Sequence, residues 1–217
     1  MDVALERAVA ELVAIGALAP DTPTEQVTDL VVTHARGLEG IEEFPALQTL
    51  SLTGADLDDW SRLAALERLS VLAVEYSTLA DVGWLRELGL AVVVLRCNRL
   101  VDVEPLGELA ALQSVDLRGN PLSSDSFAWA RDVLTRRANV LLDDQEAWRL
   151  CRQAWQARVP AVVYRDDRGL RAAWTGLSET DAPEAEHPVV SAAAVRAALS
   201  GPEGLRALIP TWRAPDA

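Results

Sequence analysis

The chain has no lysine, only two cysteines and two histidines, and no long uninterrupted apolar segment. Cys97 and Cys151 are too far apart for a metal motif or a disulfide framework, so we expect two half-buried free thiols in a reducing cytoplasm. No apolar run approaches the roughly 20 residues of a membrane span, and no membrane partner is expected. Exclusive use of arginine, together with abundant alanine, suggests a GC-rich bacterial genome.

Motifs that carry chemistry are also lacking. His34 and His187 lie in settings that suggest no Ser/His/Asp or Cys/His pairing, and there is no HExxH, CxxC, GxGxxG or P-loop pattern. The sequence therefore predicts no catalytic residue, no metal ligand and no cofactor, and hence a protein that is not an enzyme. Carboxylate sites leave faint sequence traces, which keeps an enzyme as an alternative.

The net charge of −13 is unevenly placed. Residues 145–217 hold nine acidic residues and nine arginines, so residues 1–144 carry the whole excess. Such a surface repels phosphate backbones, which argues against nucleic acid, and attracts a basic protein. The alternative is that the charge only keeps an elongated protein soluble and monomeric when free.

A leucine ladder repeats with a fixed period through the first two-thirds of the chain. Its first members, Leu47, Leu69, Leu90 and Leu112, are 22, 21 and 22 residues apart. A period of this length predicts a solenoid. The four matching sets are Leu47, Leu50, Leu52, Ala55 and Leu57; Leu69, Leu72, Val74, Ser77 and Leu79; Leu90, Val93, Leu95, Asn98 and Leu100; and Leu112, Val115, Leu117, Asn120 and Leu122.

Between the strands, apolar residues recur at every third position, which fits a three-residue-per-turn helix. Asp59, Asp81 and Asp102 each stand two residues after the leucine that closes the preceding turn. An aspartate there can accept the unpaired N–H groups that begin the return helix. We prefer this capping role to the alternative of an acidic stripe that binds a cation.

Both ends of the solenoid are expected to be covered. Residues 1–26 predict a capping helix and linker with Asp2 as N-cap, since the segment lacks the basic leader of a signal peptide. The final return, over 123–137, predicts an α-helix before a strand at 139–143, so the solenoid spans 27–144. Its expected inward residues are Phe127, Trp129 or Ala130, Val133 and Leu134.

This pattern resembles the leucine-rich repeat family in its 22-residue class. The segment Leu90–Leu112 matches the LxxLxLxxNxL consensus and the LxxLxxL that follows it. The resemblance implies an α/β solenoid, a right-handed arc with short parallel strands on the concave face and mostly 3₁₀ returns on the convex face. It also implies protein–protein recognition. The consensus asparagine is present only as Asn98 and Asn120, and its replacement by Ala35, Ala55 and Ser77 implies looser early repeats.

Residues 145–217, the C-terminal appendage, fall outside the resemblance and predict a small α+β unit. We expect a helix over 146–158 with Trp148, Cys151 and Trp155 on one face, and a hairpin of 161–165 and 170–174. A linker over 178–188 and short helices over 191–199 and 202–209 follow. The unit is either a cap or a functional module. In the second case the chemistry would belong to Tyr164, Asp166, Asp167, Arg168 and Trp174.

The concave face holds the best candidate site. Strand alternation turns the residues between the leucines outward. The predicted surface is an apolar patch of Val71, Ala73, Val92 and Val94 with a rim of Glu75, Tyr76, Arg96, Asp116 and Arg118. An apolar centre with a charged, aromatic rim is typical of a protein interface. The alternatives are that valine is there for strand propensity alone, or that the appendage folds over the patch.

The sequence thus predicts a cytoplasmic bacterial protein that binds another protein through its concave face. Its specific role is hypothesised to be that of an immunity or inhibitor protein. The alternatives are repeats that target a catalytic or ligand-binding C-terminal module, and a structural adaptor. Trp84, which lies off the core stepping, is either exposed or covers a seam between repeats.

Overall fold

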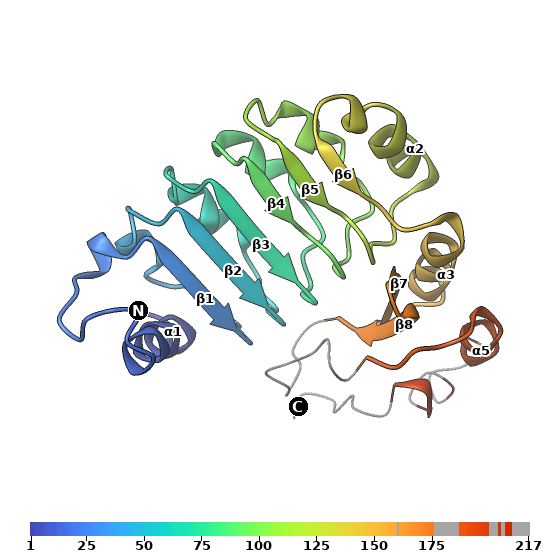
Figure 1. The fold of residues 1–217 in the computed structure, drawn as a ribbon, viewed down its shortest axis with the longest axis horizontal. Helices are drawn as coiled ribbons and strands as arrows, with labels where there is room; N and C mark the ends of the chain where they lie inside the picture. Colours follow the sequence, from blue (N-terminus) through green and yellow to red (C-terminus); the bar gives the residue numbers. More distant parts are fainter. Residues whose placement is uncertain (160, 176–186, 200–203, 205–206, 210–217) are drawn as a thin grey trace.

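The computed structural model describes residues 1–159, 161–175, 187–199, 204 and 207–209. Six parallel strands form one sheet in sequence order and curve into an arc, with short helices along the outer side (Figure 1). The chain is therefore an α/β solenoid. The strands are β1 (Asp29–Thr33), β2 (Thr49–Thr53), β3 (Val71–Glu75), β4 (Val92–Val94), β5 (Ser114–Asp116) and β6 (Asn139–Leu141).

The strand register follows the sequence repeat without a slip. Val71 of β3 pairs with Thr49 on one side and with Val92 on the other, and Ala73 pairs with Ser51 and Val94 in the same way. Alternate residues of each strand point into a continuous core of leucine, valine and isoleucine side chains. The columns predicted from the ladder are therefore the columns of the sheet.

The returns between β1 and β5 are 3₁₀ helices, as the three-residue stepping predicts. Asp59, Asp81 and Asp102 cap three of them, accepting hydrogen bonds from the N–H of Ser61 at 3.0 Å, Gly83 at 3.2 Å and Glu104 at 2.9 Å. The capping role of this column is confirmed. The 3₁₀ helices are η1 (Thr24–Gln26), η2 (Ile41–Glu43), η3 (Trp60–Ala65), η4 (Gly83–Glu87), η5 (Glu104–Glu108) and η6 (Leu134–Arg136).

A left-handed residue follows the strand in each of the first five repeats. The backbone φ is positive at His34, Gly54, Tyr76, Cys97 and Gly119, with values from 51° to 74°. Except at Gly119, the backbone N–H of this residue donates to a carbonyl of the next repeat, so the sharp turn also continues the interstrand bonding. Two glycines in this column were a sequence signal for the turn, because glycine adopts positive φ at the lowest cost.

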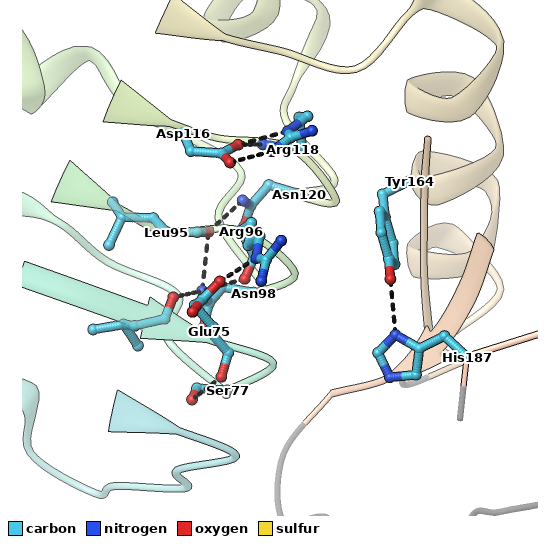
Figure 2. Close-up of polar contacts among 11 residues, drawn as sticks. Glu75, Ser77, Leu95, Arg96, Asn98, Asp116, Arg118, Asn120, Tyr164 and His187 are labelled. Carbon is cyan, nitrogen blue, oxygen red and sulfur yellow. Dashed lines mark hydrogen bonds and ion pairs between the residues drawn. The ribbon is translucent and has the colours of Figure 1, made fainter. Parts of the chain in front are cut away.

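An asparagine ladder ties the later repeats together (Figure 2). Asn98 Nδ2 donates to the carbonyls of Val74 and Leu95, and Asn120 Nδ2 donates to those of Leu95 and Leu117. In an earlier repeat the hydroxyl of Ser77 accepts from Ala55 N–H at 2.9 Å. Ser77 thus makes part of the bonding that the consensus asparagine would make.

The first repeat is covered by α1 (Val3–Ala14), which packs against β1. The Asp2 carboxylate accepts from the N–H of Ala4 at 2.8 Å, as an N-cap does. Leu5 and Ala8 are buried and extend the core of the solenoid. The predicted capping helix is therefore present, and among the described residues no helix is long and apolar enough to cross a membrane.

The return between β5 and β6 begins with the helix α2 (Ser124–Asp132), and α3 (Gln145–Gln156) follows the last strand. Phe127, Ala130 and Leu134 are buried as predicted. The prediction for Val133 is wrong: it is 42% exposed, because the α-helix ends at Asp132 and the chain continues into η6.

The appendage continues with the hairpin of β7 (Ala161–Asp166) and β8 (Gly169–Trp174), and with α5 (Ala192–Ala198), which packs against α3. The predicted hairpin is confirmed. The linker predicted over 178–188 lies outside the described residues up to residue 186, and the helix predicted over 202–209 is described only in part.

The appendage shares a hydrophobic cluster with the solenoid. Tyr76 and Cys97, from the left-handed column, pack with Cys151 of α3 and with Val163 and Tyr164 of β7. Both cysteines are fully buried, so the expectation of half-buried thiols is wrong. The domain boundary near residue 144 stays a prediction.

Candidate protein-interaction surface

Four small apolar side chains form the centre of the concave face. Val71 and Ala73 of β3 pair directly with Val92 and Val94 of β4, and all four are partly exposed. The hairpin and α5 do not bury them. The four residues are called the concave patch below.

The charged rim is neutralised within the chain. Arg96 forms an ion pair with Glu75, and Arg118 pairs with Asp116 through two hydrogen bonds of 3.0 and 2.6 Å. Figure 2 shows these pairs beside the asparagine ladder. Asp116 is buried, whereas the sequence predicted it in an exposed rim. Its hydrogen bonds raise the pKa of Arg118. The rim is thus a set of fixed dipoles with little net charge.

Tyr76 departs from the predicted rim. Its side chain is only 2% exposed, because the left-handed turn after β3 directs it under the appendage. Its ring lies 4.8 Å from the His187 ring and 6.4 Å from the Tyr164 ring, measured between centroids. The Arg96 guanidinium lies 5.5 Å from the centroid of the Tyr76 ring. Tyr76 therefore joins the rim to the appendage and offers no exposed contact surface.

Tyr164 and His187 form a buried polar pair within the appendage (Figure 2). The Tyr164 hydroxyl lies 2.9 Å from His187 Nδ1. Burial lowers the pKa of His187 to about 4 and raises the pKa of Tyr164 to about 12, so both groups are neutral near pH 7. The sequence placed His187 in a linker without a partner and named Tyr164 only as a candidate of a C-terminal module, so no pattern linked the two residues.

Asp143 joins the last repeat to the hairpin. Its buried carboxylate accepts from the backbone N–H of Gly119 at 2.5 Å and from that of Arg165 at 3.3 Å. Burial raises the pKa of Asp143 to about 7. The side chain stands where a further repeat would supply a carbonyl, so it closes the column of interstrand bonds.

The hairpin residues considered for chemistry do not converge on one site. Asp166 accepts from the N–H groups of Arg168 and Gly169 in the turn and pairs with Arg171 at 2.8 Å. Tyr164 is occupied with His187, and the Trp174 indole donates to the carbonyl of Ile209 at 3.2 Å. In the part of the chain that the structure describes, no group of three or more His, Cys, Asp or Glu residues is placed to hold a metal ion.

Trp84 is partly buried. Its indole N–H donates to the Asp81 carbonyl at 3.0 Å, and its ring packs against the solenoid core. That it covers a seam between repeats stays a prediction.

No family model matches the chain, and no curated protein is significantly similar to it. The solved structures that are similar to it include two internalins from Listeria monocytogenes. Internalin C2 is 18% identical with a TM-score of 0.44, over 67% of this chain and 77% of that chain. The internalin inlF is 19% identical with a TM-score of 0.44, over 70% of this chain and 56% of that chain. The repeat period, strand register and asparagine ladder of the chain itself give it the fold of a leucine-rich-repeat solenoid.

Proposed function

We propose that the chain is a non-enzymatic module that binds a partner protein through the concave patch. The observation that carries this proposal is the apolar centre of Val71, Ala73, Val92 and Val94 between rim charges that are already paired. A partner that covers the patch gains apolar burial without having to neutralise a buried charge. The leucine-rich-repeat fold agrees with this role but does not specify it.

Two arginine substitutions in one sheet column test the patch. Val94→Arg places a charge in its centre, and Val31→Arg makes the same change in β1, where the side chain is already 52% exposed. Proteins captured from a lysate of the source organism by the wild type and by Val31→Arg, but not by Val94→Arg, are partners of the patch. For such a partner we expect Val94→Arg to cost about 2 kcal/mol or more of binding free energy. Equal affinity of both variants overturns the assignment.

The rim is tested by a charge exchange. Arg96→Glu places two carboxylates side by side, and adding Glu75→Arg restores an ion pair of the opposite orientation. If the partner contacts these charges, the double variant stays impaired. If the ion pair serves only to fix the rim, the double variant recovers the wild-type affinity.

The finer proposal is an immunity or inhibitor role, in which the patch masks the active site of a partner enzyme or toxin. The acidity of residues 1–144 supports a basic partner and a fast, salt-sensitive association. Stoichiometric loss of the partner's activity on adding the chain, relieved by Val94→Arg, is the expected result. A captured partner that stays fully active points instead to an adaptor. The hairpin residues, which are engaged in structural bonds, give a C-terminal catalytic module no support.

A further inference from the structure

A second surface, on α3, differs in chemistry from the concave patch. Two hollows of about 470 and 490 Å³ adjoin each other and share Gln156 in their linings. Arg149 and Arg152 line the first, and Arg99 and Arg158 line the second. No carboxylate is among the described residues that line either hollow. On a chain with a net charge of −13, this is a local concentration of cations.

The first hollow is built on a rigid stack. The ring of Trp148 lies on Phe127 with centroids 4.4 Å apart, and its indole N–H donates to the Leu122 carbonyl at 2.9 Å. The Arg152 guanidinium lies over the Trp148 ring at 5.6 Å and donates to Ser124 Oγ at 2.6 Å. Arg152 is therefore held in place before any ligand arrives, which lowers the entropic cost of binding.

The second hollow combines a half-buried cation with an exposed aromatic ring. Arg99 Nε donates to Thr175 Oγ1 at 3.2 Å, and burial lowers the pKa of Arg99, while the charge of Asp56 opposes that shift. An anion in the hollow would offset the desolvation of this guanidinium. Trp155 is 40% exposed and lines the same hollow as Arg99.

Arg158 adopts an unusual backbone for its residue type. Its φ is 57°, in the left-handed region that favours glycine, at the turn that ends α3. Its N–H donates to the Trp155 carbonyl at 2.9 Å. The N–H of Val159 donates to the Ala154 carbonyl at 3.0 Å. Glycine would fit this position better, so an arginine here carries a conformational cost.

We propose that this α3 face is a binding site for an extended acidic segment of a partner protein. The guanidinium groups take carboxylates as charge-assisted, bidentate pairs, and Trp155 packs against the intervening chain. The helical rise from Arg149 to Gln156, where α3 ends, is ~10 Å, and Arg158 lies two residues further along the chain. An extended peptide advances ~3.4 Å per residue, so acidic side chains about four residues apart reach both hollows. A nucleic-acid strand is less suitable, because its continuous phosphates would run onto the acidic solenoid.

The test mixes the full chain with a fluorescein-labelled decapeptide of glutamate. Binding is measured at low salt by the fluorescence anisotropy of the peptide. A decapeptide of serine is the neutral probe, and a ten-nucleotide strand of thymidine is the phosphate probe. We expect binding of the glutamate peptide alone, weakening as salt screens the charges. Equal binding of the serine peptide, equal or tighter binding of the DNA strand, or no binding of the glutamate peptide overturns the proposal.

Two variants locate the site, and one serves as a matched control. Arg158→Gly removes a guanidinium from the second hollow while relieving the positive φ, so its melting temperature should equal or exceed that of the wild type. Arg149→Gln removes an exposed charge from the first hollow, and Arg36→Gln removes one from the first repeat. We expect Arg158→Gly and Arg149→Gln each to weaken binding about fivefold or more, and Arg36→Gln to leave it unchanged.

Sedimentation of the chain without a ligand tests the other possible occupant of the site, a second copy of the chain. A dimer that Arg158→Gly dissociates would mean that the acidic surface of a second copy fills the site, which overturns the proposal as stated. A monomer at all concentrations, together with the peptide result, supports it. The site is independent of the concave patch, so Val94→Arg should bind the glutamate peptide as the wild type does.

Discussion

The carboxylate of Asp143 accepts a hydrogen bond from the backbone N–H of Gly119 at 2.5 Å. In the four preceding repeats the residue at this position donates to a backbone carbonyl of the next repeat. At the end of the solenoid a side chain takes over that role. The same carboxylate accepts from Arg165 of β7, so the bond that ends the repeats also docks the appendage.

Replacing Asp143 with asparagine should change how stability depends on pH. The pKa of Asp143 rises from its ordinary 3.8 to about 7 on folding, so between these values the folded protein binds more protons at this residue than the unfolded chain does. This residue therefore makes the free energy of unfolding fall as pH rises from 4 to 7. An asparagine side chain does not titrate in this range, so the variant should lack this fall.

His187 also changes its pKa on folding. The effect of Asp143 is therefore measured as the difference in the free energy of unfolding between the wild type and the Asp143→Asn variant. Its pKa falls from 6.5 to about 4 on folding, so its contribution to stability is lost as pH drops through that range, opposite to the effect of Asp143. Urea unfolding of both proteins between pH 4 and 8 isolates the Asp143 term, since the His187 term is common to both. A difference that is independent of pH would contradict the buried carboxylate.

Gly119→Ala should destabilise the fold more than Gly16→Ala. The two glycines have nearly equal φ values, 74° and 73°. A Cβ on Gly119 would lie 2.7 Å from Cys97 Sγ and 3.0 Å from the Cys97 backbone N, whereas one on Gly16 would have no atom within 4 Å. We expect about 1 kcal/mol for Gly16→Ala, from positive φ alone, and at least about 1 kcal/mol more for Gly119→Ala. Thermal or urea unfolding measures both, and equal losses would refute the close contact.

The asparagine ladder predicts an order of destabilisation. Asn120→Ala removes two hydrogen bonds donated to the Leu95 and Leu117 carbonyls and one accepted from Leu100 N–H. Leaving these buried backbone groups unpaired should cost about 3 kcal/mol. Ser77→Ala removes one bond in each direction and should cost roughly half as much. Urea unfolding that ranks Ser77→Ala as the more damaging change would show that the serine is not a partial substitute.

The two thiols should report on how firmly the appendage is docked. Burial raises the pKa of Cys97 well above its usual value and that of Cys151 to about 12, so neither should react with a disulfide reagent at pH 8 until the protein unfolds. Tyr164→Ala removes a ring from the cluster that covers Cys97 and should speed its modification.

Tyr164→Phe is the matched control for the thiol experiment. It keeps the ring and loses only the hydroxyl, which lies 2.9 Å from His187 Nδ1 and also interacts with Tyr76, so its modification rate should stay close to that of the wild type. Rapid modification of the wild type would show that the appendage opens readily. Equal rates for the Ala and Phe variants would show that ring packing does not protect Cys97.

The sheet and its caps could be predicted because they depend on local and periodic rules. A 22-residue step fixes the register of Val71, Val92 and their neighbours, since each repeat must place its leucines in the same core. Asp59, Asp81 and Asp102 were recognisable because a cap lies a fixed number of residues from the helix it serves.

Part of the candidate site could not be predicted. The strand alternation that placed Val94 on the concave face says nothing about Tyr76, which lies one residue beyond its strand in a left-handed turn. Gly54 and Gly119 in the same column were the available signal for that turn. The burial of Tyr76 and the pairing of Tyr164 with His187 depend on where the hairpin docks, and no period relates the hairpin to the repeats.

The sequence alone thus determined the solenoid, its strand columns and the position of the concave patch, because contacts between adjacent repeats recur with the sequence period. Only the tertiary structure decided which candidate residues stay accessible. It showed Glu75 and Asp116 paired within the rim, Tyr76 buried, and Arg158, just after α3, beside Arg99. These outcomes depend on contacts between segments far apart in the chain, whose packing the local pattern of residues does not encode.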